Sequence, residues 1–285
     1  MKASDLPHRS VLYMPGSNAR ALEKARGVDV DAVILDLEDA VAPGDKAAAR
    51  GMVAEAVAAG GFGHRRVVVR VNGADTPWGA EDLAAAVAMA PDAILLPKVE
   101  SVETIRALAE RLPGDGTTRI WAMMETPRGM LRALEIAEAS PLMEAFVLGT
   151  NDLLKDLQAS FRPDRLALQA GLGECLLAAR AAGLICLDGV YNAFKDEDGL
   201  RAECAQGRDM GFDGKTLIHP AQVPVTHEVF SPDAEAVSGA EAIVQAFEAA
   251  AGGVAVLNGR IVEGLHVEAA ERLLRRARAI AERGS

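Results

Sequence analysis

Residues 120–152 read IWAMMETPRGMLRALEIAEASPLMEAFVLGTND, and this stretch contains the repeating unit on which the fold prediction rests. A short apolar segment, 120–124, runs up to Glu125. A helical segment follows Pro127, and a second apolar segment, 145–148, ends shortly before Asp152. A strand that is apolar on both faces is typical of a parallel sheet covered by helices. The stretch therefore predicts a strand–helix–strand unit with one carboxylate beyond each strand.

The same alternation of apolar and helical segments continues in both directions along the chain. We predict eight strands, at residues 10–14, 30–37, 66–71, 92–96, 120–124, 145–148, 184–187 and 214–218. Eight strand–helix units within about 220 residues are typical of an α/β protein with a (β/α)8 TIM barrel, and we place the catalytic domain at residues 1–220. An open doubly wound sheet is the alternative. It predicts a glycine-rich phosphate loop after the first strand, and residues 14–18, MPGSN, do not match G-x-G-x-x-G.

The pattern changes after residue 220. Residues 234–251 and 267–282 are predicted helices, and residues 254–256 and 260–262 flank Leu257-Asn258-Gly259, a strong hairpin signal. We expect residues 221–285 to form a C-terminal helical and hairpin appendage. It either packs on its own barrel or reaches over a neighbouring subunit.

The composition excludes several classes of protein. The 285-residue chain has a formal net charge of −11, the wrong sign for a general binder of nucleic acid or anionic membranes. The first nine residues contain no apolar signal core, and no stretch approaches the ~20 apolar residues that span a bilayer. The three cysteines lack C-x-x-C spacing, which favours a reduced, cytoplasmic protein.

The two carboxylates Glu125 and Asp152 predict a metal site. They follow two consecutive parallel strands, so both would project into one pocket at the same end of the barrel. Two hard oxygen ligands, with room for water and substrate, are how proteins usually hold Mg2+, and Mn2+ is an alternative ion. This indicates a metal-dependent enzyme that acts on an oxygen-rich anion.

Other unusual polar residues also follow the predicted strands, where the active site of a barrel lies. They are Asp36, Glu38, Asp39, Arg70, Asn72, Lys98, Glu100, Arg128, Asp188, Lys215 and His219.

Arg70 stands in the apolar segment Val67-Val68-Val69-Arg70-Val71, and an unpaired buried guanidinium is costly. A bidentate carboxylate from the protein or the substrate would satisfy it, and we favour a substrate-facing role. Asp36 and its neighbours Glu38 and Asp39 are either ion-pair partners or catalytic groups. The lysines Lys98 and Lys215 would suit Schiff-base chemistry if they were deprotonated, but nearby carboxylates favour ion pairing.

Seven segments together resemble one known family. They are Arg9–Gly16 (RSVLYMPG), Asp36–Val41 (DLEDAV), Val69–Gly73 (VRVNG), Leu96–Glu100 (LPKVE), Glu125–Gly129 (ETPRG), Gly149–Leu153 (GTNDL) and Gly214–Pro220 (GKTLIHP). In this order they resemble the citrate lyase beta-subunit-like proteins, which include malyl-CoA and citramalyl-CoA lyases, of the wider HpcH/HpaI aldolase group.

The resemblance implies a barrel with Mg2+ on Glu125 and Asp152, and a substrate carboxylate held by Arg70. It also implies a homotrimer or homohexamer whose C-terminal segment lies over a neighbour's site. In such relatives an Asp of that segment is the acid/base, and here residues 260–266, RIVEGLH, place Glu263 at this position. The predicted catalytic residues are therefore Glu263 and Arg70, and the predicted substrate-binding residues are Arg70, Glu125, Asp36 and Lys98.

The predicted reaction is reversible carbon–carbon cleavage of a carboxylate-bearing 3-hydroxyacyl-CoA, such as malyl-, methylmalyl- or citramalyl-CoA. The products would be acetyl-CoA or propionyl-CoA and a 2-oxoacid. Arg20, Lys24 and Lys46 are candidates for the CoA phosphates. The alternatives are a malyl-CoA thioesterase, a free-acid aldolase, the citryl thioester lyase subunit of a citrate lyase complex, and a non-catalytic protein that binds CoA or an acyl carrier.

Overall fold

The computed structural model describes residues 6–114, 116–250 and 254–283, and its chain divides into two compact units. One unit is His8–Glu228, and the other comprises residues from Val229 onward together with the first residues of the chain. We describe each unit by itself, and the predicted domain boundary after residue 220 stays a prediction.

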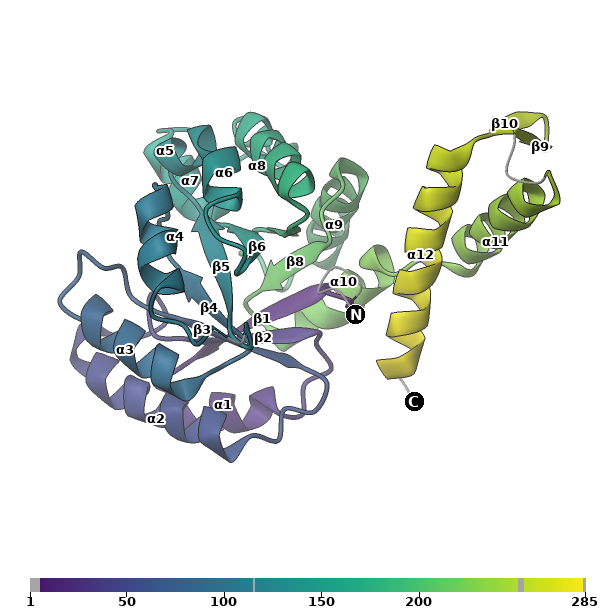
Figure 1. Cartoon of the computed structure of the whole chain (residues 1–285). Helices are drawn as coiled ribbons and strands as arrows, with labels where there is room; N and C mark the ends of the chain where they lie inside the picture. The colour runs from purple at the N-terminus through teal and green to yellow at the C-terminus, as the bar shows by residue number, and fades with distance from the viewer. Residues whose placement is uncertain (1–5, 115, 251–253, 284–285) are drawn as a thin grey trace. The chain divides into compact units, whose positions relative to one another are not determined.

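The first unit is a closed barrel of eight parallel strands in sequence order (Figure 1). The strands are β1 (Ser10–Pro15), β2 (Ala32–Asp36), β3 (Arg66–Arg70), β4 (Ala93–Leu96), β5 (Arg119–Met124), β6 (Met143–Leu148), β7 (Ile185–Asp188) and β8 (Gly214–Leu217). Strand β1 pairs in parallel with both β2 and β8, which closes the sheet. The predicted (β/α)8 barrel is confirmed, and the open sheet is excluded.

Helices surround this barrel and connect its strands (Figure 1). They are α1 (Ala19–Ala25), η2 (Pro43–Asp45), α2 (Lys46–Ala59), α3 (Gly79–Met89), α4 (Val102–Ala109), α5 (Pro127–Leu131), α6 (Ala133–Ala137), α7 (Thr150–Asp156), α8 (Gln169–Ala182), α9 (Glu197–Met210), η3 (Pro220–Gln222) and α10 (Val223–Phe230). No helix was predicted between the eighth strand and residue 234, so η3 and α10, which follow β8, are additions.

Local chemistry starts several of these helices where it was expected. Asn18 caps α1, because its side chain accepts a hydrogen bond from the Ala21 amide at 3.1 Å. Thr126 caps α5 and Pro127 is its first residue, a favoured place for proline. Such caps turn the chain back from each strand end and leave the loops above the barrel free to carry polar groups.

The barrel interior and the layer between strands and helices are apolar. All five residues of β2 are buried, and the large side chains of Trp121 and Phe146 are completely buried. Apolar packing of this size is the main source of folding free energy. Polar residues enter mostly in pairs, such as Arg9 with Asp31 at 2.9 Å and the Trp121 indole with Glu144 at 2.8 Å.

The second unit contains α11 (Ala234–Ala249), the antiparallel strands β9 (Ala255–Leu257) and β10 (Arg260–Val262), and α12 (Gly264–Arg283). Asn258 and Gly259 both have positive φ, 49° and 75°, as a type I′ hairpin turn requires. The two predicted helices and the hairpin are thus present, except that the predicted helix end at residue 251 lies outside the described residues. Helix α12 begins at Gly264, three residues before the predicted start.

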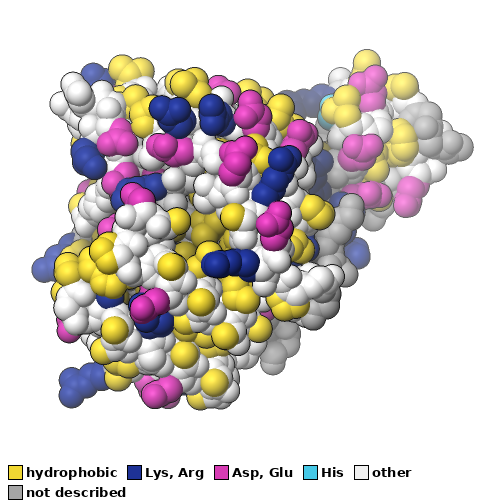
Figure 2. Space-filling model, turned by 60° about the vertical axis from the view of Figure 1, so that its left-hand side comes forward, with side chains coloured by type: hydrophobic (Ala, Val, Ile, Leu, Met, Phe, Trp, Pro, Cys, Tyr) yellow, Lys and Arg dark blue, Asp and Glu magenta, His cyan; other side chains and the backbone are white. Residues whose placement is uncertain are grey.

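Charged side chains of both signs are interspersed among the described residues on the face of the molecule in Figure 2. Within the described residues, no helix combines the length and the apolar character needed to cross a membrane.

Closure of the barrel leaves no room for a side chain at Gly214, the first residue of β8. A Cβ there would lie 2.6 Å from the carbonyl oxygen of Arg9 and closer still to that of His8. We expect Gly214→Ala to destabilise the protein by about 1–3 kcal/mol or more, the usual range for overpacking. Urea unfolding measures this.

Gly173 in α8 is the matched control, since nothing lies within 4 Å of a Cβ added there. Gly173→Ala should be neutral or stabilising by up to about 1 kcal/mol. Equal unfolding midpoints for the two variants would contradict the packing argument.

Candidate active site

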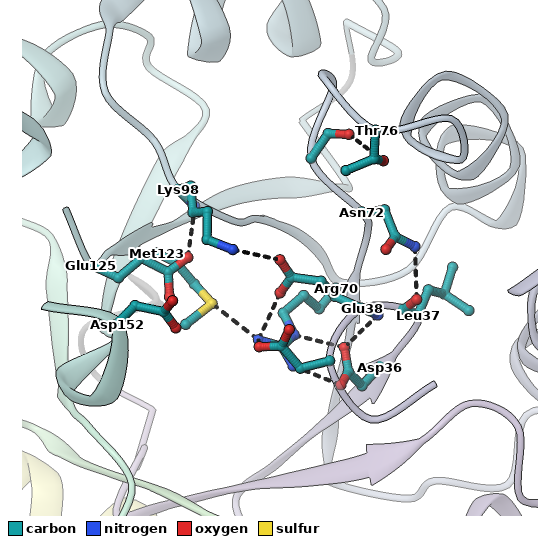
Figure 3. Close-up of polar contacts among 12 residues, drawn as sticks. Asp36, Leu37, Glu38, Arg70, Asn72, Thr76, Lys98, Met123, Glu125 and Asp152 are labelled. Atoms are coloured by element: carbon teal, nitrogen blue, oxygen red, sulfur yellow. Dashed lines mark hydrogen bonds and ion pairs between the residues drawn. The ribbon is translucent and has the colours of Figure 1, made fainter. Parts of the chain in front are cut away.

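A cavity of about 300 Å³ opens at the carboxyl ends of the barrel strands. Its lining comes from β1, β2, β3, β5 and β6 and from the loops after β2, β6, β7 and β8. The lining residues are Tyr13, Asp36, Asp39, Ala40, Arg70, Met123, Glu125, Leu148, Gly149, Thr150, Asn151, Asp152, Val190, Asn192 and Ile218. Four of the five predicted site residues of the barrel, Asp36, Arg70, Glu125 and Asp152, thus line one cavity, and Figure 3 shows polar contacts among them and Lys98.

Glu125 lies at the wall of this cavity directly after β5. It is 2% exposed, and its Oε1 accepts a hydrogen bond from the Lys98 backbone amide at 2.7 Å. Gly149 is required beside it, because a Cβ at that position would overlap the Glu125 carboxylate. Burial raises the pKa of Glu125 to about 7, although the Lys98 amide lowers it; the charge of Asp152 raises it further.

Asp152 lies in the first turn of α7, and its side chain is 26% exposed. Figure 3 shows its carboxylate beside that of Glu125. Two carboxylates that repel each other in this way fit a hard divalent cation between them. Among the described residues, no cluster of three or more metal-binding side chains forms. A cation held here would keep coordination positions for water and substrate, as a catalytic ion requires.

Arg70 is buried at the opposite side of the cavity, and its charge is satisfied by protein carboxylates. Its Nε and Nη2 donate to the two oxygens of Asp36, both at 2.6 Å, and Nη1 lies 2.9 Å from Glu38 Oε2. The guanidinium also stacks on the Tyr13 ring, 4.7 Å from its centre. Nη1 additionally contacts the Met123 sulfur at 3.5 Å, so this corner of the group is the one beside the cavity.

Asp36 is fully buried and all its acceptor positions are occupied. Besides Arg70, its oxygens accept hydrogen bonds from the backbone amides of Glu38 at 2.9 Å and Ala40 at 3.0 Å. This geometry favours Asp36 as the anchor of Arg70. The predicted contact of Asp36 with substrate stays a prediction, and it would require one of these bonds to break.

Lys98 reaches the site with both backbone and side chain. Its φ of 47° is left-handed, which aims its amide at Glu125, and its Nζ lies 3.8 Å from Glu38 Oε1. Burial lowers the pKa of Lys98, but Glu38, Asp152 and Glu125 outweigh burial and raise it. The half-exposed side chain therefore carries a positive charge beside Glu38.

Glu38 lies between the two cations. Burial raises its pKa to about 7, the charge of Arg70 lowers it, and the nearby Asp39 raises it again. Glu38 and Asp36 are thus ion-pair partners of Arg70, one of the two readings that the sequence left open.

Lys215 and Asp188 do not line the cavity, contrary to the expectation from strand ends. Lys215 is only the second residue of β8, and its fully buried Nζ donates to Asp188 at 3.1 Å and Glu203 at 2.6 Å. Burial lowers the pKa of Lys215, but the two carboxylates outweigh burial and raise it, so the group stays protonated. It therefore belongs to a buried ion-pair cluster.

Glu263 belongs to the second compact unit, where it is exposed just before α12. Its backbone amide donates to His266 Nδ1 at 3.1 Å. The barrel residues of the predicted site are brought together within one unit, whereas Glu263 is not among them.

Tyr13 and Met123 are cavity residues that the sequence analysis did not select. Both lie on strands and flank Arg70. They could have been found from the alternation of side chains along each strand, since alternate residues of a barrel strand point inward.

A closed (β/α)8 barrel with a charged cavity at the carboxyl ends of its strands is the architecture of a barrel enzyme. Residues 9–220 match the model of the HpcH/HpaI aldolase/citrate lyase family, and the chain belongs to this family.

Three relatives illustrate the range of similarity. The chain is 56% identical over 282 residues to a (3S)-malyl-CoA thioesterase of Cereibacter sphaeroides, covering 98% of each chain. It is 35% identical over 280 residues to citrate lyase subunit beta of Escherichia coli, covering 94% of this chain and 93% of the relative. The structure of CitE from Mycobacterium tuberculosis with magnesium, acetoacetate and coenzyme A superposes with a TM-score of 0.81 at 32% identity, covering 96% and 99% of the two chains.

The raised pKa of Glu125 predicts pH-dependent metal binding. A cation binds the ionised carboxylate, so below pH about 7 its binding must displace a proton from Glu125. We expect Mg2+ affinity to be about tenfold lower at pH 6 than at pH 8. Titration calorimetry at several pH values measures this. An affinity that is constant from pH 6 to pH 8, or Mg2+ binding that survives in Glu125→Gln, would contradict the assignment.

Proposed function

We propose that this protein hydrolyses the CoA thioester of a hydroxydicarboxylic acid, such as (3S)-malyl-CoA, to the free acid and CoA. The observation that carries this proposal is the 56% identity, over almost the whole chain, to proteins named (3S)-malyl-CoA thioesterase. The cavity supports it, because its cationic corner and its acidic pair suit a substrate that is both an anion and an oxygen chelator.

In this proposal the substrate carboxylate binds at Arg70 Nη1, which Asp36 holds in place from the opposite edge of the guanidinium. Lys98 adds a second positive charge beside Glu38. Glu125 and Asp152 hold Mg2+, which acts as a Lewis acid towards substrate oxygens when bound. These contacts would fix the acyl group so that only one carbonyl faces the attacking group.

The nucleophile in this proposal is water. All three cysteines are buried, and burial raises the pKa of each thiol, which makes them poor nucleophiles. Ser10 Oγ lies 2.7 Å from His227 Nε2, and His227 Nδ1 lies 3.9 Å from Asp29. This resembles a catalytic triad, but Ser10 is completely buried at the start of β1, the end of the barrel opposite the cavity. We therefore assign it a structural role.

The second candidate is the carbon–carbon cleavage expected from the sequence. It is favoured by family membership and by the similarity to citrate lyase subunit beta. In this reaction the 3-hydroxyl loses its proton, the C2–C3 bond breaks, and C2, the α-carbon of the thioester, gains a proton. Malyl-CoA would then yield acetyl-CoA and glyoxylate.

We further propose a homotrimer or homohexamer in which the C-terminal unit covers a neighbour's cavity and delivers Glu263 as acid/base. Exposed apolar side chains in this unit support the proposal. Val256 and Ile261 face each other across the hairpin and are 69% and 62% exposed, and Leu265 is 63% exposed. Apolar groups gathered in this way on a surface mark an interaction site.

The products separate the two candidate reactions. With (3S)-malyl-CoA, Mg2+ and H218O, hydrolysis should release CoA and malate in equal amounts, with one 18O in the malate carboxyl groups. Cleavage should instead give acetyl-CoA and glyoxylate without 18O in its carboxylate group. Asp152→Ala should lose at least about 100-fold in either activity while keeping its melting temperature. Unchanged turnover in that variant, or no product of either kind, would contradict the proposed function.

The role of Glu263 can be tested by mixing subunits. Glu263→Gln removes only the ionisable group, so we expect normal Mg2+ binding but a loss in turnover of at least about 100-fold, the usual scale for a general acid/base. Mixed with Asp152→Ala subunits, it should regain activity at interfaces that pair an intact cavity with an intact Glu263. Native mass spectrometry must first verify the exchange. Full activity of Glu263→Gln alone, or no recovery in verified mixtures, would contradict delivery by a neighbour.

A further inference from the structure

The positive charge of Lys46 lies in an unfavourable environment and needs strong compensation by hydrogen-bond acceptors. It is the first residue of α2, near the positive end of the helix dipole, and it is only 5% exposed. Burial of an ammonium group is unfavourable unless each of its hydrogens finds an acceptor.

The compensation comes from three oxygens, two of which belong to the loop after β2. Lys46 Nζ donates to the carbonyl oxygens of Leu37 at 2.9 Å and Glu38 at 2.7 Å, and to Asn72 Oδ1 at 2.8 Å. These contacts use all three hydrogens of the ammonium group. The Trp78 ring, 5.3 Å from Nζ, adds a cation–π contact.

Asn72 is held in turn from behind. Its Nδ2 donates to the Leu37 carbonyl at 2.7 Å and to Asp82 Oδ2 at 2.5 Å, and its backbone amide donates to the same carboxylate oxygen at 3.2 Å. Asp82 is completely buried, and Arg50 Nε donates to its other oxygen at 2.7 Å. The side chain of Asn72 is therefore fixed, and so is the oxygen that it offers to Lys46.

The same loop is held from its other side by Asp36, which accepts hydrogen bonds from the amides of Glu38 and Ala40. Lys46 thus holds the carbonyls of the loop and Asp36 holds its amides. Figure 3 shows the outcome: the side chains of Asp36 and Glu38 converge on Arg70, while the backbone carbonyl of Leu37 meets the Asn72 side chain. The backbone that carries both partners of Arg70 has little freedom to move.

We propose that Lys46 is a positioning residue for the anion-binding side of the cavity. By fixing the carbonyls of Leu37 and Glu38, it holds the carboxylates that orient Arg70 and so sets the affinity for a substrate carboxylate. The proposal rests on the function proposed above in one respect only, the binding of a 2-oxoacid or related carboxylate. It also removes Lys46 from the candidates for the CoA phosphates, because its donors are already used.

The first test needs no ligand. Lys46→Met keeps the unbranched shape of the side chain, one atom shorter, but removes its donors, so we expect the backbone amides of residues 38–41 to exchange with D2O at least about tenfold faster. The matched control is Glu55→Met, which introduces the same residue at an exposed position of the same helix, outside the hydrogen-bond network of Lys46 described above. It should leave exchange of these amides within about twofold of the unmodified protein. Unchanged exchange in Lys46→Met would overturn the proposal.

The second test measures binding of pyruvate by calorimetry in the presence of Mg2+. We expect Lys46→Met to weaken pyruvate at least about tenfold, while Mg2+ affinity without pyruvate stays within about twofold, because Glu125 and Asp152 follow other strands. Glu55→Met should match the unmodified protein in both. If Lys46→Met does not fold, Asn72→Ala replaces it, with faster exchange and weaker pyruvate binding expected in the same direction.

The outcomes separate this inference from the proposed function. Faster loop exchange with unchanged pyruvate affinity would overturn the positioning role of Lys46. Absence of pyruvate binding in the unmodified protein would contradict the proposed carboxylate substrate, and the exchange experiment alone would then decide whether Lys46 holds the loop.

Discussion

A guanidinium buried at the end of the barrel is the constraint on which the rest of the site depends. Arg70 can remain there only because Asp36 meets two of its donors in a planar, bidentate arrangement and Glu38 lies against a third nitrogen. Removal of one partner from such a pair leaves an uncompensated buried charge, which costs about 3–5 kcal/mol. The loop after β2 must therefore adopt one conformation, and Lys46 and Asp36 fix it from opposite sides.

The acidic half of the cavity differs from the Arg70 side in how its charge is compensated. Arg70 forms a bidentate ion pair with Asp36, whereas Glu125 and Asp152 lie beside each other and only more distant cations compensate them, such as Lys155 Nζ at 3.8 Å from Asp152. The barrel thus places a closely paired cation and a pair of mutually repelling carboxylates around a single cavity. An anionic chelating ligand, together with a divalent ion, complements both walls at once. The cationic wall alone would not distinguish such a ligand from simple anions. The acidic pair alone would not distinguish it from simple metal complexes.

The sequence predicted the parts of this arrangement that follow from strand order. Buried parallel strands are recognisable from continuous apolar residues, and barrel topology then requires Glu125 and Asp152 to share one end.

Contacts between residues distant in sequence were not predictable in the same way. In the sequence, Lys46 is indistinguishable from an ordinary solvent-exposed lysine at the start of a helix. It is buried only because the fold brings it against Leu37 and Asn72. Lys215 was wrongly assigned to the cavity. It is the second residue of β8, and its side chain enters the buried ion-pair cluster with Glu203. Helix α10 was missed; it is short, with eight residues, and no helix was predicted between the eighth strand and residue 234.

The burial of every native thiol has a practical consequence for studying how the two units are arranged. Cys175, Cys186 and Cys204 lie in the barrel unit beneath packed side chains, so maleimide reagents should leave them unmodified in the folded protein. A cysteine introduced on the exposed face of α12, with a second on an exposed barrel helix, would then be the only reactive pair. Fluorophores or spin labels attached there would report distances between the units, within one chain and between chains, without removal of any native residue.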